Sequence, residues 1–296
     1  MNSILKKIKI GHWDDQERGT GCTVILLPPC NITSGVLLGN APGTREFALL
    51  NPECKVEEVN AILLAGGSAM GLGASQGVAE YLKEKNIGYE TPFGKVPIVV
   101  AAVIFDLGVG NPEAYPTVEN GYIATKRAKN DLNCGNIGVG MGATVGKWMG
   151  LNYAMKGGFG IFSKEKEGIS VVAMTVVNAL GDVLNRDGSV LAGAKHPDGG
   201  FWAEKIGYSS FMSRNIPPEN TTLSVVVTDA KLSKLETYML AKRASQGLIR
   251  TLRPVNTSYD GDLVIAVSLG ESETDKETVF EMAQDVVSDS IRKAVK

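Results

Sequence analysis

Residues 216–228 read IPPENTTLSVVVT, and the residue composition changes more abruptly here than elsewhere in the chain. Two prolines end an irregular stretch, and the residues from Thr221 onward then have the composition of a buried strand. The junction places Asn220 and Thr221 where a linker meets that strand. Taken alone, Asn220-Thr221-Thr222 is also the polar start of an ordinary strand. Its position favours a second interpretation, in which the threonine hydroxyl reaches the preceding peptide bond.

The segments on both sides of this junction mix strands with helices. We predict strands at 61–65, 97–107, 158–163, 169–178, 221–228 and 262–269, and helices at 68–85, 118–130, 232–252 and 274–294. Capping-box patterns begin the last two helices, at Ser233 with Glu236 and at Thr274 with Glu277. The region 187–220 lacks periodicity and predicts a surface linker. The mixture predicts an α/β or α+β fold.

The composition is that of an ordinary globular protein, with 44% hydrophobic and 21% charged residues. The 296 residues are enough for one large domain or two small ones. The formal net charge of -2 gives no general attraction to nucleic acid or to an anionic membrane, and no apolar run is long enough for a membrane span. Residues 1–10 lack the apolar core and cleavage site of a signal peptide, so we expect a mature cytoplasmic protein.

Cysteine and histidine usage narrows the chemistry further. The four cysteines form no C-x-x-C pair, so we expect reduced and mostly buried thiols. His12 and His196 are the only histidines, which leaves few ways to build a histidine triad or a metal site. We therefore expect neither a metal nor a cofactor.

Two short motifs resemble known functional signatures, but the residues around them do not meet the requirements of those signatures. Gly73-Ala74-Ser75-Gln76-Gly77 matches the nucleophile elbow G-x-S-x-G, but Ser75 lies inside the predicted helix and not at the strand-to-helix turn that an elbow requires. Small residues that let helices pack closely are the better interpretation. GATVGK at 142–147 resembles a phosphate-binding loop, but Met141 and Trp148 stand where that motif needs glycine and a hydroxyl residue.

A threonine that becomes an N-terminus needs no histidine for activation. Cleavage between Asn220 and Thr221 would give Thr221 both a hydroxyl and a free α-amine. An α-amine has a pKa of about 7.7–8.0, which suits a general base at neutral pH. A threonine paired with its own amine is a recognised nucleophile.

Eight sequence blocks follow one another along nearly the whole chain: IGHW (10–13), GTGCTV (19–24), APGTRE (41–46), LAGGSAMGL (64–72), GATVGK (142–147), VNALGDV (177–183), NTTLSVVVTDAKLSK (220–234) and YDGDLV (259–264). Together and in this order they resemble the L-aminopeptidase/D-esterase family, which includes β-peptidyl aminopeptidases and nylon-oligomer hydrolases. The resemblance implies an αββα layered sandwich of the aminopeptidase/ornithine-acetyltransferase type. It also implies one domain, 1–296, cut into a large piece (1–220) and a small piece (221–296).

The resemblance assigns roles to four residues besides Thr221. Lys147 would lie beside the nucleophile, and the Asn178 amide would bind the oxyanion. Asp260 and Asp262 would hold the α-ammonium and the Lys147 charge in place. The ordinary alternatives are a solvated lysine, a strand-end cap and a solvated Asp-Gly turn. Threonine with two aspartates looks more like the nylon-oligomer branch.

Three functions follow as alternatives. The first is a self-processing amidohydrolase that acts on a small peptide or amide substrate. The second is an uncleaved, non-catalytic scaffold homologue. The third is an acyltransferase of the ornithine acetyltransferase type, which YDGD and the GHW block disfavour. The resemblance also implies a homo-oligomer, a tetramer.

Overall fold

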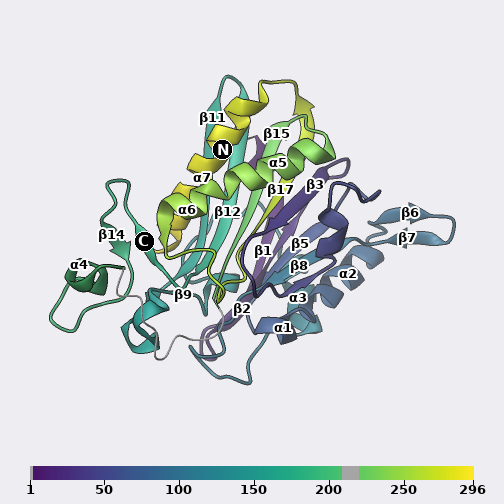
Figure 1. The fold of residues 1–296 in the computed structure, drawn as a ribbon. Coiled ribbons are helices and arrows are strands. Elements are labelled where there is room, and N and C mark those ends of the chain that lie inside the picture. The colour runs from purple at the N-terminus through teal and green to yellow at the C-terminus, as the bar shows by residue number, and fades with distance from the viewer. Residues whose placement is uncertain (1–2, 209–219) are drawn as a thin grey trace.

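Two five-stranded sheets form the centre of the protein, whose computed structural model describes residues 3–208 and 220–296 (Figure 1). The first sheet has the order β1 (Lys9–Asp15), β2 (Thr20–Leu26), β5 (Ala61–Ala65), β8 (Val99–Val103) and β4 (Thr44–Arg45). The second has the order β11 (Gly158–Lys166), β12 (Ile169–Asn178), β15 (Thr221–Ala230), β17 (Leu263–Ser272) and β3 (Ile32–Leu37). Within these sheets β5 pairs with β8, and β15 with β17, in parallel; the other neighbours are antiparallel.

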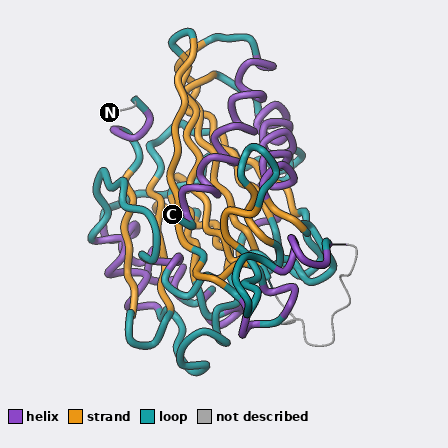
Figure 2. Tube along the Cα trace, turned by 90° about the vertical axis from the view of Figure 1, so that its left-hand side faces the viewer, coloured by secondary structure: helices purple, strands orange, loops and turns teal. Residues whose placement is uncertain are grey.

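Helices cover the outer face of each sheet. Helices α2 (Ala74–Glu84) and α3 (Val118–Lys126) pack beside the first sheet, and α5 (Lys234–Ala244), α6 (Gln246–Thr251) and α7 (Lys276–Ala294) beside the second. Figure 2, turned by 90°, shows the strands between helices on two sides. The predicted αββα sandwich and mixed fold class are confirmed.

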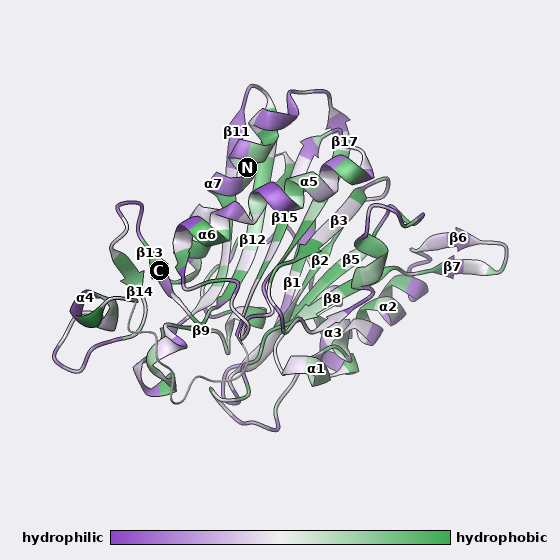
Figure 3. Cartoon of the chain, in the orientation of Figure 1, coloured by the Kyte–Doolittle hydropathy of each residue, from purple (hydrophilic) through white to green (hydrophobic). Residues whose placement is uncertain are grey.

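Side chains that alternate along the strands build three apolar layers. On β15, Leu223, Val225 and Val227 lie in the core between the two sheets, whereas Val226 and Ala230 pack against α5–α7. This alternation is the period of two that any strand has. Apolar residues therefore occur on both faces of β15, and Figure 3 shows that hydrophobic residues predominate along the central strands.

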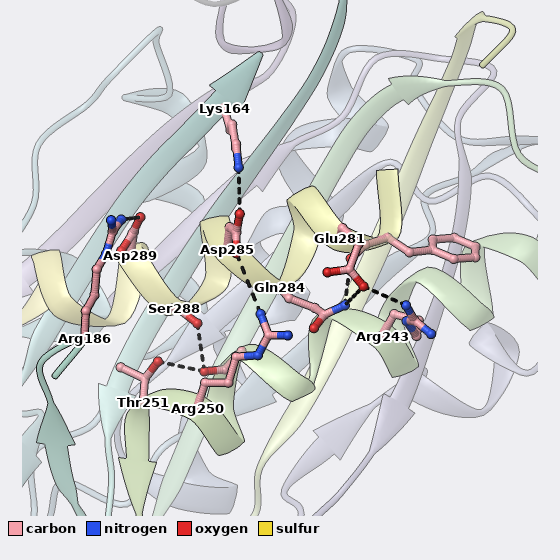
Figure 4. A network of polar contacts seen from close by, with 12 residues as sticks. Lys164, Arg186, Arg243, Arg250, Thr251, Glu281, Gln284, Asp285, Ser288 and Asp289 are labelled. Atoms are coloured by element: carbon pink, nitrogen blue, oxygen red, sulfur yellow. Dashed lines mark hydrogen bonds and ion pairs between the residues drawn. The ribbon is translucent and has the colours of Figure 1, made fainter. Parts of the chain in front are cut away.

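Ion pairs fasten α7 to its neighbours on the solvent side (Figure 4). Lys164 of β11 contacts Asp285 at 2.6 Å, Arg186 contacts Asp289 at 2.7 Å, and Arg243 of α5 contacts Glu281 at 2.8 Å. Exposed pairs of this kind contribute about 0–1 kcal/mol each. The apolar layer beneath α7 therefore dominates its attachment.

The predicted strands are present, with shifted ends in several cases, but three helix predictions need correction. The predicted helix 68–85 is two helices, α1 (Ser68–Gly71) and α2, and the predicted helix 232–252 is α5 and α6. The capping box at Ser233 and Glu236 is confirmed. The box at Thr274 and Glu277 is wrong, because Asp275 is the N-cap and accepts the Thr278 N–H.

The predicted linker 187–220 contains regular structure, namely β14 (Val190–Ala192) and α4 (Trp202–Ile206). Its Pro-rich end, 216–219, lies outside the described residues. The remaining short strands are β6 (Tyr89–Thr91), β7 (Gly94–Val96), β9 (Thr144–Val145), β10 (Met155–Lys156), β13 (Asp182–Leu184) and β16 (Leu252–Arg253). In the described part of the chain no helix combines the length and apolarity that a membrane crossing needs.

All four cysteines are free, as predicted, but they are not mostly buried. Only Cys22 is buried, Cys30 is exposed, and Cys54 and Cys134 are half-buried. Close packing at the GASQG segment is confirmed, because a Cβ on Gly77 would come within 1.8 Å of the Val118 carbonyl oxygen of α3.

Candidate active site

Thr221 begins β15 in the middle of the second sheet, and its side chain contacts the peptide bond that precedes it. The Thr221 hydroxyl donates a hydrogen bond to the Asn220 carbonyl oxygen at 2.6 Å. The Gly261 N–H donates to the same oxygen at 2.7 Å. Thr221 also lines a cavity of about 270 Å³, together with 41–43, 68–69 and 103–105.

Asn178 lies beside Thr221 on the neighbouring strand β12, and Lys147, the first residue of a short 3₁₀ helix (Lys147–Met149), contacts Asn178. Asn178 ends β12 and is the direct cross-strand partner of Thr221. The Lys147 ammonium donates to the Asn178 carbonyl oxygen at 2.9 Å and to its Oδ1 at 2.8 Å. The Asn178 Nδ2 donates to the Phe105 carbonyl oxygen at 3.0 Å. Lys147 is only 2% exposed, which excludes the alternative of a solvated lysine.

Asp260 and Asp262 approach from the other side, on the loop that leads into β17. The Asp262 carboxylate accepts the Thr222 N–H at 2.6 Å and the Asn256 N–H at 3.1 Å. Asp260 accepts both the N–H and the hydroxyl of Thr257 at 2.7 Å. Both aspartates are 2% exposed, so a solvated turn is excluded.

Burial dominates the electrostatics of this cluster. It lowers the pKa of Lys147 to about 7, although the charges of Asp260, Asp262 and Asp106 oppose this change. Burial raises the pKa of Asp262 to about 8, and the neighbouring Asp260 charge adds to the rise. Burial also raises the pKa of Asp260. Lys147 and Asp262 therefore both have pKa values near neutral pH, and strongly shifted pKa values of this kind are common in catalytic centres.

The other sequence candidates lie in different environments. Ser75 is in helix α2, where its hydroxyl donates to the Leu72 carbonyl oxygen and accepts from Arg45. His12 bonds Thr23, and His196 packs on Trp202 and accepts the Asp198 N–H. None of these contacts involves the five predicted site residues.

Two residues near the cavity were not singled out from the sequence. Phe105 supplies the carbonyl that fixes Asn178, and Asp106 is a buried carboxylate directly after it. The only signal was an acidic residue at the end of an apolar strand. Its partners come from segments far apart in the chain, so spacing alone gave no indication of them.

The family and the relatives that this chain matches place it among the hydrolases that act on amide bonds. The chain belongs to peptidase family S58, whose model matches residues 5–296.

Relatives and solved structures agree with this assignment. An uncharacterized aminopeptidase of Mycobacterium tuberculosis is 39% identical over 289 residues, which covers 91% of this chain and 82% of that protein. A 6-aminohexanoate-oligomer endohydrolase of Agromyces is 30% identical over 272 residues, with coverages of 89% and 73%. The L-aminopeptidase D-Ala-esterase/amidase of Ochrobactrum anthropi, described as a new variant among the Ntn hydrolase fold, superimposes with a TM-score of 0.73 at 19% identity and coverages of 99% and 85%.

Proposed function

We propose that this hydrolase cuts its own chain between Asn220 and Thr221 and then uses Thr221 as an N-terminal nucleophile. The observation that carries the proposal is the contact of the Thr221 hydroxyl with the Asn220 carbonyl group. The mature enzyme would be one domain assembled from fragments 1–220 and 221–296. It would hydrolyse small peptides or peptide-like amides.

Self-cleavage begins with attack of the Thr221 oxygen on the carbonyl carbon of Asn220. As the new C–O bond forms and the C–N bond breaks, the acyl group moves from the Thr221 nitrogen to its oxygen, and the nitrogen takes up the proton that the hydroxyl loses. Water then hydrolyses the ester and releases the Asn220 carboxylate. The Gly261 N–H already bonds the carbonyl oxygen, where negative charge develops during the attack.

Turnover uses the amine that the cut creates. In its neutral form the α-amine takes the proton of the Thr221 hydroxyl as the oxygen attacks the substrate carbonyl. One amide hydrogen of Asn178 is occupied by the Phe105 carbonyl. The second is the proposed donor to the oxyanion of the substrate. When they are ionised, Asp260 and Asp262 hold the ammonium form, while Lys147 fixes the Asn178 amide and its positive charge opposes a second one.

Relatives support a peptide-like amide as the substrate class. Proteins called aminopeptidase and 6-aminohexanoate-oligomer endohydrolase both match this chain over most of its length. We further propose that the enzyme is cytoplasmic and homo-oligomeric, a tetramer as the family resemblance implies.

The test is Thr221→Ala, with Thr221→Ser as the matched control. We expect the alanine variant to fold, to remain one chain on a denaturing gel and to lose turnover. The serine variant keeps a hydroxyl and is expected to give two fragments and residual activity. Two fragments of normal size from the alanine variant would refute the assignment.

A further inference from the structure

Asp106 is a buried carboxylate that joins two distant segments at the edge of the cavity. It accepts the Gly67 N–H at 2.6 Å and the Thr20 hydroxyl at 2.8 Å, and it is 2% exposed. Two glycines make room for it, since a Cβ on Gly66 or Gly142 would lie 2.1 or 2.4 Å from its Oδ2. These two glycines therefore leave the space that the Asp106 carboxylate occupies.

One of the two segments that Asp106 bonds, the turn at Gly67, leads directly into residues 68–69, which line the cavity together with Thr221. Ser68, next to Gly67, adopts a left-handed φ of 52°, which is uncommon for a residue with a side chain. Its N–H donates to the Ile104 carbonyl oxygen at 3.0 Å. Ser68, Ile104 and Phe105 all line the cavity with Thr221. The Asp106 carboxylate therefore fixes the turn that presents Ser68 to the cavity.

Asp106 also follows directly on the residue that orients Asn178. The Phe105 carbonyl accepts the Asn178 Nδ2, and the position of this carbonyl depends on the backbone that Asp106 anchors. A shift in this backbone would turn the Asn178 amide away from the substrate carbonyl. By contrast, the Asn220 carbonyl is bonded by Gly261 and Thr221, and neither bond involves Asp106.

We propose that Asp106 is a positioning residue, which aligns the cavity wall and the Asn178 amide for turnover but is not needed for self-cleavage. This inference rests on the proposed function. It predicts that a change at Asp106 lowers the hydrolysis of substrate by Thr221 but leaves self-cleavage by the same threonine intact. Misalignment of a group that binds the transition state lowers kcat more than it raises KM.

Asp229 provides a matched control at the opposite end of β15. Its buried carboxylate also accepts one backbone N–H, from Ser170 at 2.9 Å, and one hydroxyl, from Ser3 at 3.3 Å. Asp229→Asn should therefore perturb the fold about as much as Asp106→Asn. Thr20→Val removes one of the two contacts of Asp106 without changing the carboxylate.

The experiment measures fragments on a denaturing gel and kcat and KM on the amino-acid p-nitroanilide that the wild type hydrolyses fastest. We expect Asp106→Ala to be cleaved, with kcat at least ~10-fold lower and KM changed by less than ~3-fold. Asp106→Asn should recover part of kcat, since its amide oxygen still accepts the Gly67 N–H, and Asp229→Asn should stay near wild type.

Several outcomes would overturn the inference. If Asp106→Ala does not fold, full kcat in both Asp106→Asn and Thr20→Val refutes it. An equal loss of kcat in Asp229→Asn would mean general destabilisation. An uncleaved but folded Asp106→Ala would mean that Asp106 acts on the nucleophile. A wild-type chain that is never cleaved would instead refute the proposed function itself.

Discussion

Replacing Lys147 by methionine should abolish turnover and yet stabilise the fold in mildly acidic solution. Burial lowers the pKa of Lys147 from 10.5 to about 7. That difference corresponds to about 5 kcal/mol of destabilisation of the buried ammonium. Methionine has a similar shape without the charge. It leaves the Asn178 carbonyl oxygen without its Lys147 donor, at a cost of about 1–3 kcal/mol.

The net expectation at pH 6 is a variant more stable by about 2–4 kcal/mol. Asp262, with a pKa of about 8, carries its proton at this pH, so removal of the lysine does not leave it as an unpaired buried charge. Between pH 7 and pH 10.5 the unfolded chain holds a proton on Lys147 that the folded chain lacks. The parent therefore gains about 1.4 kcal/mol per pH unit relative to the variant as pH rises through this window.

The measurement is urea denaturation at pH 6, 7, 8 and 9, followed by tryptophan fluorescence. Both proteins carry Thr221→Ala so that each unfolds as one chain. The difference between them cancels the contributions of titrating groups that do not interact with Lys147, such as Cys22. Parallel stability curves from pH 6 to 9 would refute the reasoning, because Lys147 would then keep an ordinary pKa despite its burial.

Two further predictions concern the acid-base chemistry. Asp260→Asn should move the acidic limb of kcat/KM to lower pH, since the Thr221 ammonium loses a stabilising negative neighbour, and should lower the turnover rate; His196→Ala should leave the limb in place. A limb abolished by His196→Ala and untouched by Asp260→Asn would contradict the amine as base. Turnover should survive exhaustive treatment with a chelator, because within residues 3–208 and 220–296 no group of three His, Cys, Asp or Glu side chains is arranged to hold a metal ion. Activity lost on chelation and restored by a divalent ion would contradict this expectation.

Local sequence predicted the parts of the fold that depend on local chemistry. The strands at 169–178 and 221–228 are rich in β-branched residues, and Ser233 caps its helix as its spacing to Glu236 indicates. The break between α5 and α6 at Ser245 was missed because the apolar pattern continues through it. The N-cap moved to Asp275 because two neighbouring residues can both accept an N–H.

The site could be predicted only in part for a related reason. The motifs identified five polar residues, and the structure brings all five together around the 220–221 bond. Phe105 and Asp106 were missed because their partners lie more than 35 residues away, at Asn178, Gly67 and Thr20. Contacts between loops depend on the tertiary arrangement, which no short spacing encodes.

The order of the second sheet has a consequence for biosynthesis. Strands β15 and β17 come from the last quarter of the chain, yet they fill the space between β12 and β3, which are synthesised much earlier. A ribosome that releases its product before Asp260 would deliver a protein without β17 and without the Gly261 N–H at the scissile carbonyl. Under the proposed self-cleavage, a new N-terminus at Thr221 would therefore indicate that synthesis had passed Gly261 and that the loop leading into β17 had taken its place beside β15.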